Sequence, residues 1–283
     1  MPISKEHKDI LETYYRVSNS TYSNWGPEKE SPDVFAIHLG YIPESETVFD
    51  NRVAVSRTTQ IVVDTLDVQD GNKILDAGCG VGSISFRIAK QYPNAIVFPV
   101  NIVSNQLETI NNHIRTNEIQ NVYPTRQDFQ LTGFANDTFD KTVFCESLAH
   151  AQNKHELLKE AFRTSKQGGK LVIADCFGYT DEYNEKEREY FRHFQEGMAV
   201  PSIIKYETFE SWMREIGFKN IKGIDLTKNM IQSAVFASEH AQMRIDREPE
   251  TSSEITLGRL AMIGIEKLMS TKKVGYYLIT AEK

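Results

Sequence analysis

Residues 73–82 read KILDAGCGVG, and this stretch decides the fold. A short apolar run reaches Asp76, three glycines then alternate through a turn, and a helical pattern follows over 83–91. Glycines at this spacing let the backbone turn sharply and let a bulky ligand approach without interference from a Cβ atom. The spacing is G-x-G-x-G, whereas G-x-G-x-x-G seats a dinucleotide pyrophosphate on a helix N-terminus. The shorter form, preceded by Asp76, suits a nucleoside that has no phosphate to hold.

Length and composition indicate one globular domain with insertions. The chain has 283 residues, 40% hydrophobic and 25% charged, which is ordinary for a globular protein. A formal charge of -7 argues against nucleic acid or an anionic membrane as the main partner, because either would require a basic field. No apolar run reaches membrane-spanning length and the N-terminus has no apolar signal core, so we expect a cytoplasmic protein without membrane insertion.

The cysteines do not suggest a metal site or a disulfide framework. Cys79, Cys145 and Cys176 are widely spaced and form no C-x-x-C pair. We therefore expect no structural metal, and small thiols at strand ends that serve packing.

Strand-like and helix-like segments alternate from about residue 53 to 225, which predicts a parallel, doubly wound α/β sheet. Apolar residues at helical spacing around Ile110 and around Leu158 predict two helices, and Gly168-Gly169 is expected to end the second one. The predicted strands are 73–76, 95–101, 121–126, 140–145, 170–175, 219–225 and 274–281.

Several segments agree, in order and spacing, with one family. Besides the glycine turn, they are Asn101-Ile102 with Gln106, Gln127-Asp128-Phe129, the loop 134–140 and Gln167-Gly168-Gly169 before an apolar strand. Together they resemble the motifs of class I S-adenosylmethionine (SAM) methyltransferases over residues 45–180. The resemblance implies a Rossmann-like, seven-stranded, mostly parallel sheet. It also implies SAM as cofactor and S-adenosylhomocysteine (SAH) as product, held by Asp76, Gly78, Gly80, Asn101, Ile102, Gln106, Asp128 and Phe129.

Individual positions refine this resemblance. Asn101 stands where the family usually has an acid that binds the ribose, and an amide loses the charge-assisted part of that bond. In this departure the sequence resembles the sterol, tocopherol and natural-product C-methyltransferases, in which the acid is often replaced. The implied sheet order places Pro124 at an edge, where a missing donor is tolerated, and Pro99 in an interior strand, where we expect a frayed or bulged end.

Residues 145–150, Cys-Glu-Ser-Leu-Ala-His, follow the fourth predicted strand. The Asn/Asp-Pro-Pro-Tyr/Phe motif of nucleic-acid and many protein methyltransferases is absent from the sequence, and Glu-Ser-x-x-His is similar to small-molecule C-methyltransferases. We expect Glu146 to act as a base or as a counter-charge, and His150 to shuttle a proton. The alternatives are a helix N-cap or cofactor contact for Glu146, and a solvated or structural imidazole for His150.

Segments outside the sheet are rich in aromatic residues, and the resemblance places such additions over the carboxyl ends of the strands. We predict an N-terminal cap over 1–50, a SAM-binding core over 51–177, a lid over 178–216, and a C-terminal part over 217–283 with a helical insertion at 229–272. The alternative is that the aromatic side chains simply pack these helices down. The candidate substrate-binding residues are Tyr22, Trp25, His38, Tyr41, Tyr179 and Tyr183.

The predicted function is methyl transfer from SAM to a small metabolite, with carbon methylation of an isoprenoid-like acceptor favoured. A prenyl diphosphate acceptor would need basic groups, for which Arg52, Arg57, Arg188, Arg192 and Lys205 are available. The alternatives are O- or N-methylation of a natural product, and a non-catalytic SAM-binding protein. An NAD-dependent oxidoreductase is disfavoured by the glycine spacing. The apolar N-terminal and lid helices could form a homo-oligomer interface.

Overall fold

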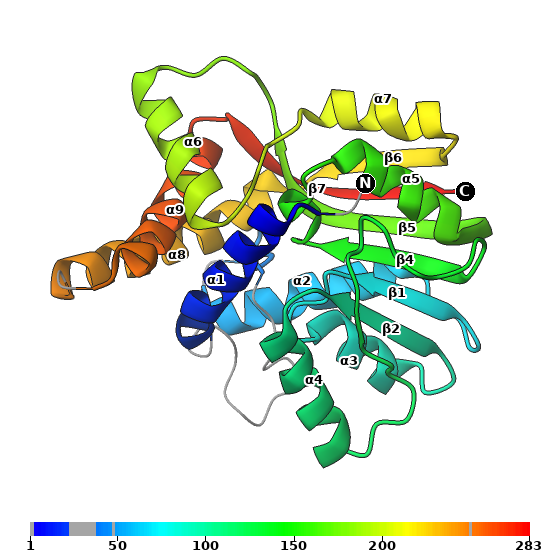
Figure 1. Ribbon diagram of the computed structural model, residues 1–283. Helices are drawn as coiled ribbons and strands as arrows, with labels where there is room; N and C mark the ends of the chain where they lie inside the picture. Colours follow the sequence, from blue (N-terminus) through cyan, green and yellow to red (C-terminus); the bar gives the residue numbers. More distant parts are fainter. Residues whose placement is uncertain (1–2, 23–37, 47–48, 249–250) are drawn as a thin grey trace.

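A computed structural model describes residues 3–22, 38–46, 49–248 and 251–283, with only the backbone described over 16–22. Its centre is a seven-stranded sheet in the order β3-β2-β1-β4-β5-β7-β6 (Figure 1). Strand β7 runs antiparallel to both neighbours, and the other described pairings are parallel. The predicted Rossmann-like fold is therefore confirmed. The strands are β1 Lys73–Ala77, β2 Ile96–Asn101, β3 Thr125–Arg126, β4 Phe139–Cys145, β5 Ser165–Gly178, β6 Lys219–Asp225 and β7 Val274–Glu282.

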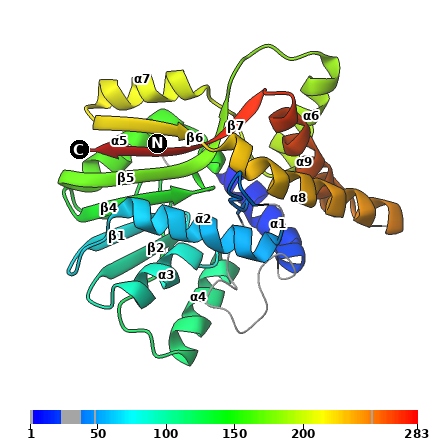
Figure 2. The ribbon, with the colours of Figure 1, turned by 180° about the vertical axis from the view of Figure 1, so that it is seen from behind.

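Helices cover both faces of the sheet. Helices α2, α3 and α4 contribute to one apolar cluster, and α5 and α7 contribute to the cluster on the opposite face. Figure 2 shows α2 lying across the back of the sheet. The helices are α1 Lys5–Tyr22, α2 Asn51–Leu66, α3 Ser83–Gln91, α4 Ser104–Thr116, α5 Lys154–Thr164, α6 Glu185–Gly197, α7 Tyr206–Ile216, α8 Thr227–Arg247 and α9 Ser253–Ser270, with a 3-10 turn η1 at Leu148–His150.

The two prolines have different outcomes. Pro124 lies at the sheet edge, as predicted, but it directly precedes β3 instead of lying within the strand. The prediction of a frayed or bulged strand at Pro99 is wrong, because Pro99 pairs in regular register with Asp76. The hydrogen bonds explain why: Val97 N–H donates to Asn121 O and Asn101 O accepts from Gln127 N–H, so odd-numbered residues of β2 face β3. The missing N–H of Pro99 therefore faces the interrupted edge strand, where no regular ladder needs it.

The glycine pair at 168–169 does not end a helix, contrary to prediction. Helix α5 already ends at Thr164, and the pair lies inside β5, opposite a register shift in β4. Gly168 has φ +72 and donates its N–H to Lys283 O, while Gly169 O accepts from Lys283 N–H. A Cβ on Gly169 would lie 2.7 Å from Lys166 O, so this position has no room for a larger residue, whereas Gly168 is favoured by its positive φ.

Helices α1, α6, α8 and α9 gather beyond the carboxyl ends of the parallel strands (Figure 1), and we call them the covering helices. The segment 178–216, expected as one lid, divides: α6 packs against α9, whereas α7 packs beside α5 on the sheet through the buried Phe209 and Met213. Helices α6 and α9 approach closely because Gly197 and Gly264 have no room for a Cβ atom. No helix of the described ranges is long and apolar enough to span a bilayer.

Candidate active site

The glycine turn after β1 is fixed by its neighbours. Gly78 and Gly82 have φ +75 and +100, in the left-handed region that favours glycine. Gly78 N–H donates to Val100 O at 2.9 Å, which ties the turn to β2. A Cβ on Gly78 would lie 2.5 Å from Ser147 Cβ, so the turn closes directly against the segment that follows β4.

Asp76 is buried at the end of β1 and faces a cavity beside this turn. Its Oδ2 accepts a 2.6 Å hydrogen bond from Ser85 Oγ of helix α3. Burial raises the pKa of this carboxyl to about 6, and the bond from Ser85 opposes that rise. Asp76 therefore brings a carboxyl group to the lining of this cavity, as predicted for a cofactor-binding residue.

The Asn101 side chain is held in part by hydrogen bonds that its amide group donates and that a carboxylate could not donate. Its Nδ2 donates to Gly80 O at 3.2 Å and to Gln106 Oε1 at 2.8 Å, and its Oδ1 accepts from Val103 N–H at 3.0 Å. A carboxylate at this position could not donate to either acceptor. The departure from the family's usual acid is therefore matched by the pairing of Asn101 with Gln106.

Asp128 and Phe129 complete the predicted cofactor side. Asp128 Oδ1 accepts from Gln130 N–H at 2.9 Å, and Oδ2 accepts from Ile3 N–H at 2.7 Å. Phe129 packs edge-on against Phe144 of β4, with ring centroids 5.9 Å apart. Sequence reasoning missed Ile3, because no local pattern connects it to a residue 125 positions away.

All eight predicted cofactor residues line two adjoining cavities. The cavities share Tyr15, Gly78, Gly80 and His150. The smaller cavity adds Asn101, Ile102, Gln106, Asp128 and Phe129, and Asp76 lines the larger one. The described lining of the smaller cavity contains no lysine or arginine, so it offers acceptors and amides for a nucleoside but no cation for a phosphate. The residues present fit the adenosine of SAM.

Glu146 follows β4 in a strained conformation. Its φ is +50, which is unusual for a residue with a side chain. Residues in such strained conformations are concentrated at functional sites. Its N–H donates to Ala174 O at 2.8 Å, and its Oε1 accepts from Leu39 N–H at 2.8 Å. Burial raises the pKa of this carboxyl to about 8, with a smaller rise from the charge of Asp175. The N-cap of η1 is Ser147, so Glu146 is not the N-cap that we considered as its alternative role.

His150 ends η1 and bonds through both ring nitrogens. Its Nδ1 lies 3.3 Å from Ala199 O and its Nε2 lies 3.0 Å from Tyr15 Oη. A carbonyl only accepts, so Nδ1 carries the proton and Nε2 accepts from the Tyr15 hydroxyl. Burial lowers the pKa of this imidazole to about 4, which keeps the ring neutral at pH 7.

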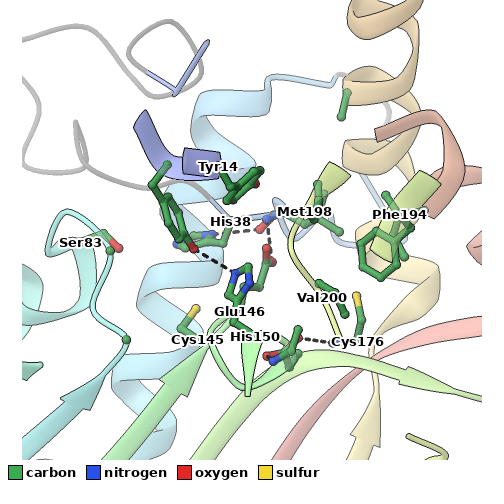
Figure 3. Close-up of a pocket in the computed structure, with 18 of the residues that line it drawn as sticks. Tyr14, His38, Ser83, Cys145, Glu146, His150, Cys176, Phe194, Met198 and Val200 are labelled. Carbon is green, nitrogen blue, oxygen red and sulfur yellow. Dashed lines mark hydrogen bonds between the residues drawn. The ribbon is translucent and has the colours of Figure 1, made fainter. Parts of the chain in front are cut away.

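The larger cavity has an apolar wall opposite these polar groups. Figure 3 shows Glu146 and His150 at its centre, with Tyr14 on one side and Phe194, Met198 and Val200 on the other. Its other apolar or weakly polar lining residues are Leu39, Cys79, Ile84, Cys145, Ala149, Cys176, Ala234, Ala237, Met262 and Ile265. Among the described residues, no group of three or more His, Cys, Asp or Glu side chains is placed to hold a metal ion.

The predicted substrate residues are only partly brought together. His38 lines the larger cavity. The Tyr22 side chain and Trp25 lie outside the described residues. Tyr41 is not among the lining residues, and it packs partly buried against the core cluster instead. Tyr14, Tyr15 and Phe194 line the cavity although their aromatic segments gave no signal that separated cavity from core.

Tyr179 and Tyr183 also lie away from the lining of the larger cavity. The hydroxyl of Tyr179 bonds to Asp225 and, at 2.9 Å, to Thr227. Tyr183 donates to Thr180 O at 3.0 Å and packs against Phe191. Both side chains therefore stabilise connections around β5 and α6. This agrees with the alternative interpretation, in which the aromatic residues pack the helices down.

A cavity lining that offers acceptors and amides but no described cation, beside a buried carboxyl group and an apolar wall, is the arrangement expected of a SAM-dependent methyltransferase that acts on small molecules. The chain belongs to the methyltransferase domain family, whose model matches residues 68–217. The predictions of a SAM-dependent enzyme and of its cofactor are confirmed.

Named relatives and solved structures agree with this family. The chain is 26% identical to O-methyltransferase resE of Aspergillus sclerotiorum over 258 residues, 89% of this chain and 91% of that protein. It is 25% identical to 24-methylenesterol C-methyltransferase 3 of Arabidopsis thaliana over 234 residues, 78% of this chain and 59% of that protein. The fold is similar to the cyclopropane synthase MmaA2 from Mycobacterium tuberculosis, with a TM-score of 0.81, 16% identity and 98% of each chain covered.

Proposed function

We propose that this methyltransferase acts on an uncharged, largely apolar acceptor in the larger cavity, and that Glu146 takes up the proton released. The observation that carries the proposal is the position of Glu146, whose carboxyl lies in one cavity with the glycine turn and the apolar wall. SAM supplies an activated methyl group on a sulfonium, so the chain's own residues have to orient the acceptor, exclude water and accept a proton.

The charges around the cavity support an uncharged acceptor. The described residues that line it include no lysine or arginine. Two of the candidate phosphate ligands are paired elsewhere, Arg57 with Glu46 and Lys205 with Asp181. Arg188 and Arg192 lie exposed on α6. A diphosphate in the cavity would therefore bring its charge next to Glu146 without a lysine or arginine in the described lining to balance it.

An alkene carbon of an isoprenoid-like acceptor is the methylation site we favour. A new carbon–carbon bond would form from the alkene electron pair as the methyl–sulfur bond breaks, leaving a cation on the acceptor. Tyr14 and Tyr15 line the larger cavity, and their aromatic rings would stabilise that cation. The Glu146 carboxylate would then remove a proton from the neighbouring carbon and restore a double bond.

A hydroxyl acceptor is the second candidate. The Aspergillus relative that matches most of the chain is named an O-methyltransferase. A hydroxyl would also deliver its proton to Glu146, as oxygen attacks the methyl carbon and the methyl–sulfur bond breaks. The geometry of Glu146 serves both acceptors, so the new bond distinguishes them.

The test is incubation with SAM carrying a ¹³C-methyl group and a panel of neutral terpenoid alkenes, terpenoid alcohols, phenols, amines and geranyl diphosphate. Mass spectrometry detects the product, and the ¹³C chemical shift separates a methyl on carbon from one on oxygen or nitrogen. We expect product from a neutral terpenoid alkene. Product from the diphosphate alone would contradict the uncharged acceptor, and a methoxy shift would favour the second candidate.

A further inference from the structure

Asp175 and Lys154 are buried charged residues that the proposed proton transfer does not use directly. Only 2% of Asp175 and 4% of Lys154 is exposed. Buried ions are costly unless they are paired and hydrogen-bonded, so both positions need an explanation. They lie on opposite sides of the turn η1, which directly follows Glu146 and Ser147 in sequence.

Asp175 binds the amide side of this turn. It lies near the end of β5, the strand next to β4, and lines the larger cavity. Its Oδ2 accepts the N–H of Ala149 at 3.0 Å, and its Oδ1 accepts the N–H of Cys176 at 2.8 Å. One carboxylate therefore connects β5 to the turn that follows Glu146.

Lys154 binds the carbonyl side of the same turn. Its Nζ donates to Ala149 O and Ala151 O, both at 3.0 Å, and lies 3.5 Å from Ser202 Oγ. Ala149 is the residue that both charged groups contact: its N–H donates to Asp175 and its carbonyl accepts from Lys154. The acid faces amide groups and the ammonium faces carbonyls, so each charge complements the dipole of the peptide it contacts.

The two charges also influence each other and Glu146. Burial raises the pKa of Asp175 to about 6, and Lys154 opposes that rise. Burial lowers the pKa of Lys154 to about 8, and Asp175 opposes that fall. Asp175 is thus ionised at pH 7, and its negative charge contributes to the raised pKa of Glu146.

We propose that Asp175 and Lys154 are positioning residues: together they fix the turn after Glu146, and Asp175 supplies a negative charge beside the Glu146 carboxyl. The charge makes the Glu146 carboxylate a stronger proton acceptor, and the fixed turn holds the backbone that aims it. The inference rests on the proposed function, in which Glu146 takes up the proton released from the acceptor. The other titratable groups that face this cluster are Tyr15 of α1, Asp76 of β1, Cys145 of β4, His150 of η1, Cys176 of β5 and Tyr276 of β7.

The test follows the titration of Glu146 in protein labelled with ¹³C at the glutamate carboxyl carbon, bound to SAH and without any acceptor. The signal that disappears in E146Q identifies Glu146. In D175N the loss of the neighbouring negative charge should lower the titration midpoint by at least about half a pH unit. If D175N does not fold, D175S removes the same charge with a smaller side chain.

Hydrogen exchange tests the turn. In K154M the amides of residues 148–151 should exchange at least about fivefold faster, since a charge-assisted bond is lost. K154R keeps the charge and should restore slow exchange. An unchanged Glu146 midpoint in the Asp175 variants, or equally fast exchange in K154M and K154R, would overturn the inference. Neither measurement uses an acceptor, so failure of the proposed function would appear separately, as full turnover in E146Q.

Discussion

The backbone N–H of Ile3 lies 2.7 Å from Oδ2 of Asp128 and donates a hydrogen bond to it. The other carboxylate oxygen already accepts from Gln130 N–H at 2.9 Å. The resemblance to SAM methyltransferases assigns Asp128 to the exocyclic amine of adenine, which would donate to the same carboxylate. Ile3, two residues before α1, thus donates to a carboxylate that the adenine amine would also use, and we expect the two donors to compete.

Ile3→Pro removes the competing donor, because proline has no N–H. We expect SAH to bind about fivefold more tightly to this variant, corresponding to roughly 1 kcal/mol for one net hydrogen bond. Ile3→Ala keeps the N–H and is the matched control, with an affinity close to that of the unchanged chain. Isothermal titration calorimetry with SAH measures all three. Weaker binding to the proline variant than to the alanine variant would mean that this segment assists the cofactor.

Glu146→Gln tests the proton acceptor. The amide keeps the acceptor for Leu39 N–H but cannot take up a proton. Turnover should fall by about a hundredfold or more, while SAM affinity stays within a few-fold. Single-turnover rates and equilibrium binding, measured with an acceptor found in the panel, separate the two effects. A variant that keeps full turnover would return Glu146 to a cofactor-contact or structural role.

The same residue predicts a pH profile. Its pKa is raised to about 8, so the carboxyl is protonated below that pH and ionised above it. Only the ionised form accepts a proton, and kcat/KM should therefore rise with pH up to about 8 and then level off. A profile for the free enzyme that is flat between pH 6 and 8 would show that another group takes up the proton.

The sequence predicted what local patterns control. Helix α3 begins and ends where predicted, since the glycine turn and the apolar periodicity both lie within a few residues. Pro99 lies in the predicted strand, but the expected frayed or bulged end is wrong, because the tolerance of its missing N–H depends on an interrupted neighbouring strand. Tyr179 resembled a cavity residue because aromatic periodicity does not reveal which neighbour a ring meets, here Asp225. The bond between Ile3 and Asp128 joins residues that only the folded chain brings together.

The buried His38 side chain makes the free energy of unfolding depend on pH. Burial lowers its pKa to about 4, and its ring nitrogens lie 3.1 Å from Leu39 O and 3.0 Å from Thr59 Oγ1. The unfolded chain takes up this proton near pH 6.5 and the folded chain does not, so the stability it contributes is full above 6.5 and is lost as pH falls toward 4. Between pH 7 and 5 the unchanged chain should lose about 2 kcal/mol more than His38→Gln.

Urea denaturation at both pH values measures this difference. Asp76, Glu146 and Asp175 have raised pKa values and contribute with the opposite sign, but they are common to both proteins and cancel in the comparison. Equal losses in the two proteins would show that His38 is protonated in the folded state.

Two glycines of α9 provide a matched test of the covering helices. A Cβ on Gly264 would lie 2.5 Å from Tyr190 O of α6, whereas a Cβ on Gly258 would find its nearest atom, Gly197 O, at 3.9 Å. Gly264→Ala should push α6 outward and cost about 1–3 kcal/mol of unfolding free energy. Gly258→Ala should be neutral or stabilise the helix by up to about 1 kcal/mol, since alanine has the higher helix propensity.

The same two glycine variants test whether the packing of α6 against α9 shapes the larger cavity. Helix α6 carries Phe194 into the wall of the larger cavity, whereas the adjoining smaller cavity is lined by α1 and the sheet side of the site. Gly264→Ala should therefore raise the KM for the acceptor several-fold and leave SAH affinity unchanged. Gly258→Ala should change neither. Equal urea midpoints for the two variants would mean that α6 and α9 separate without cost, and the close approach of these helices would then not shape the larger cavity.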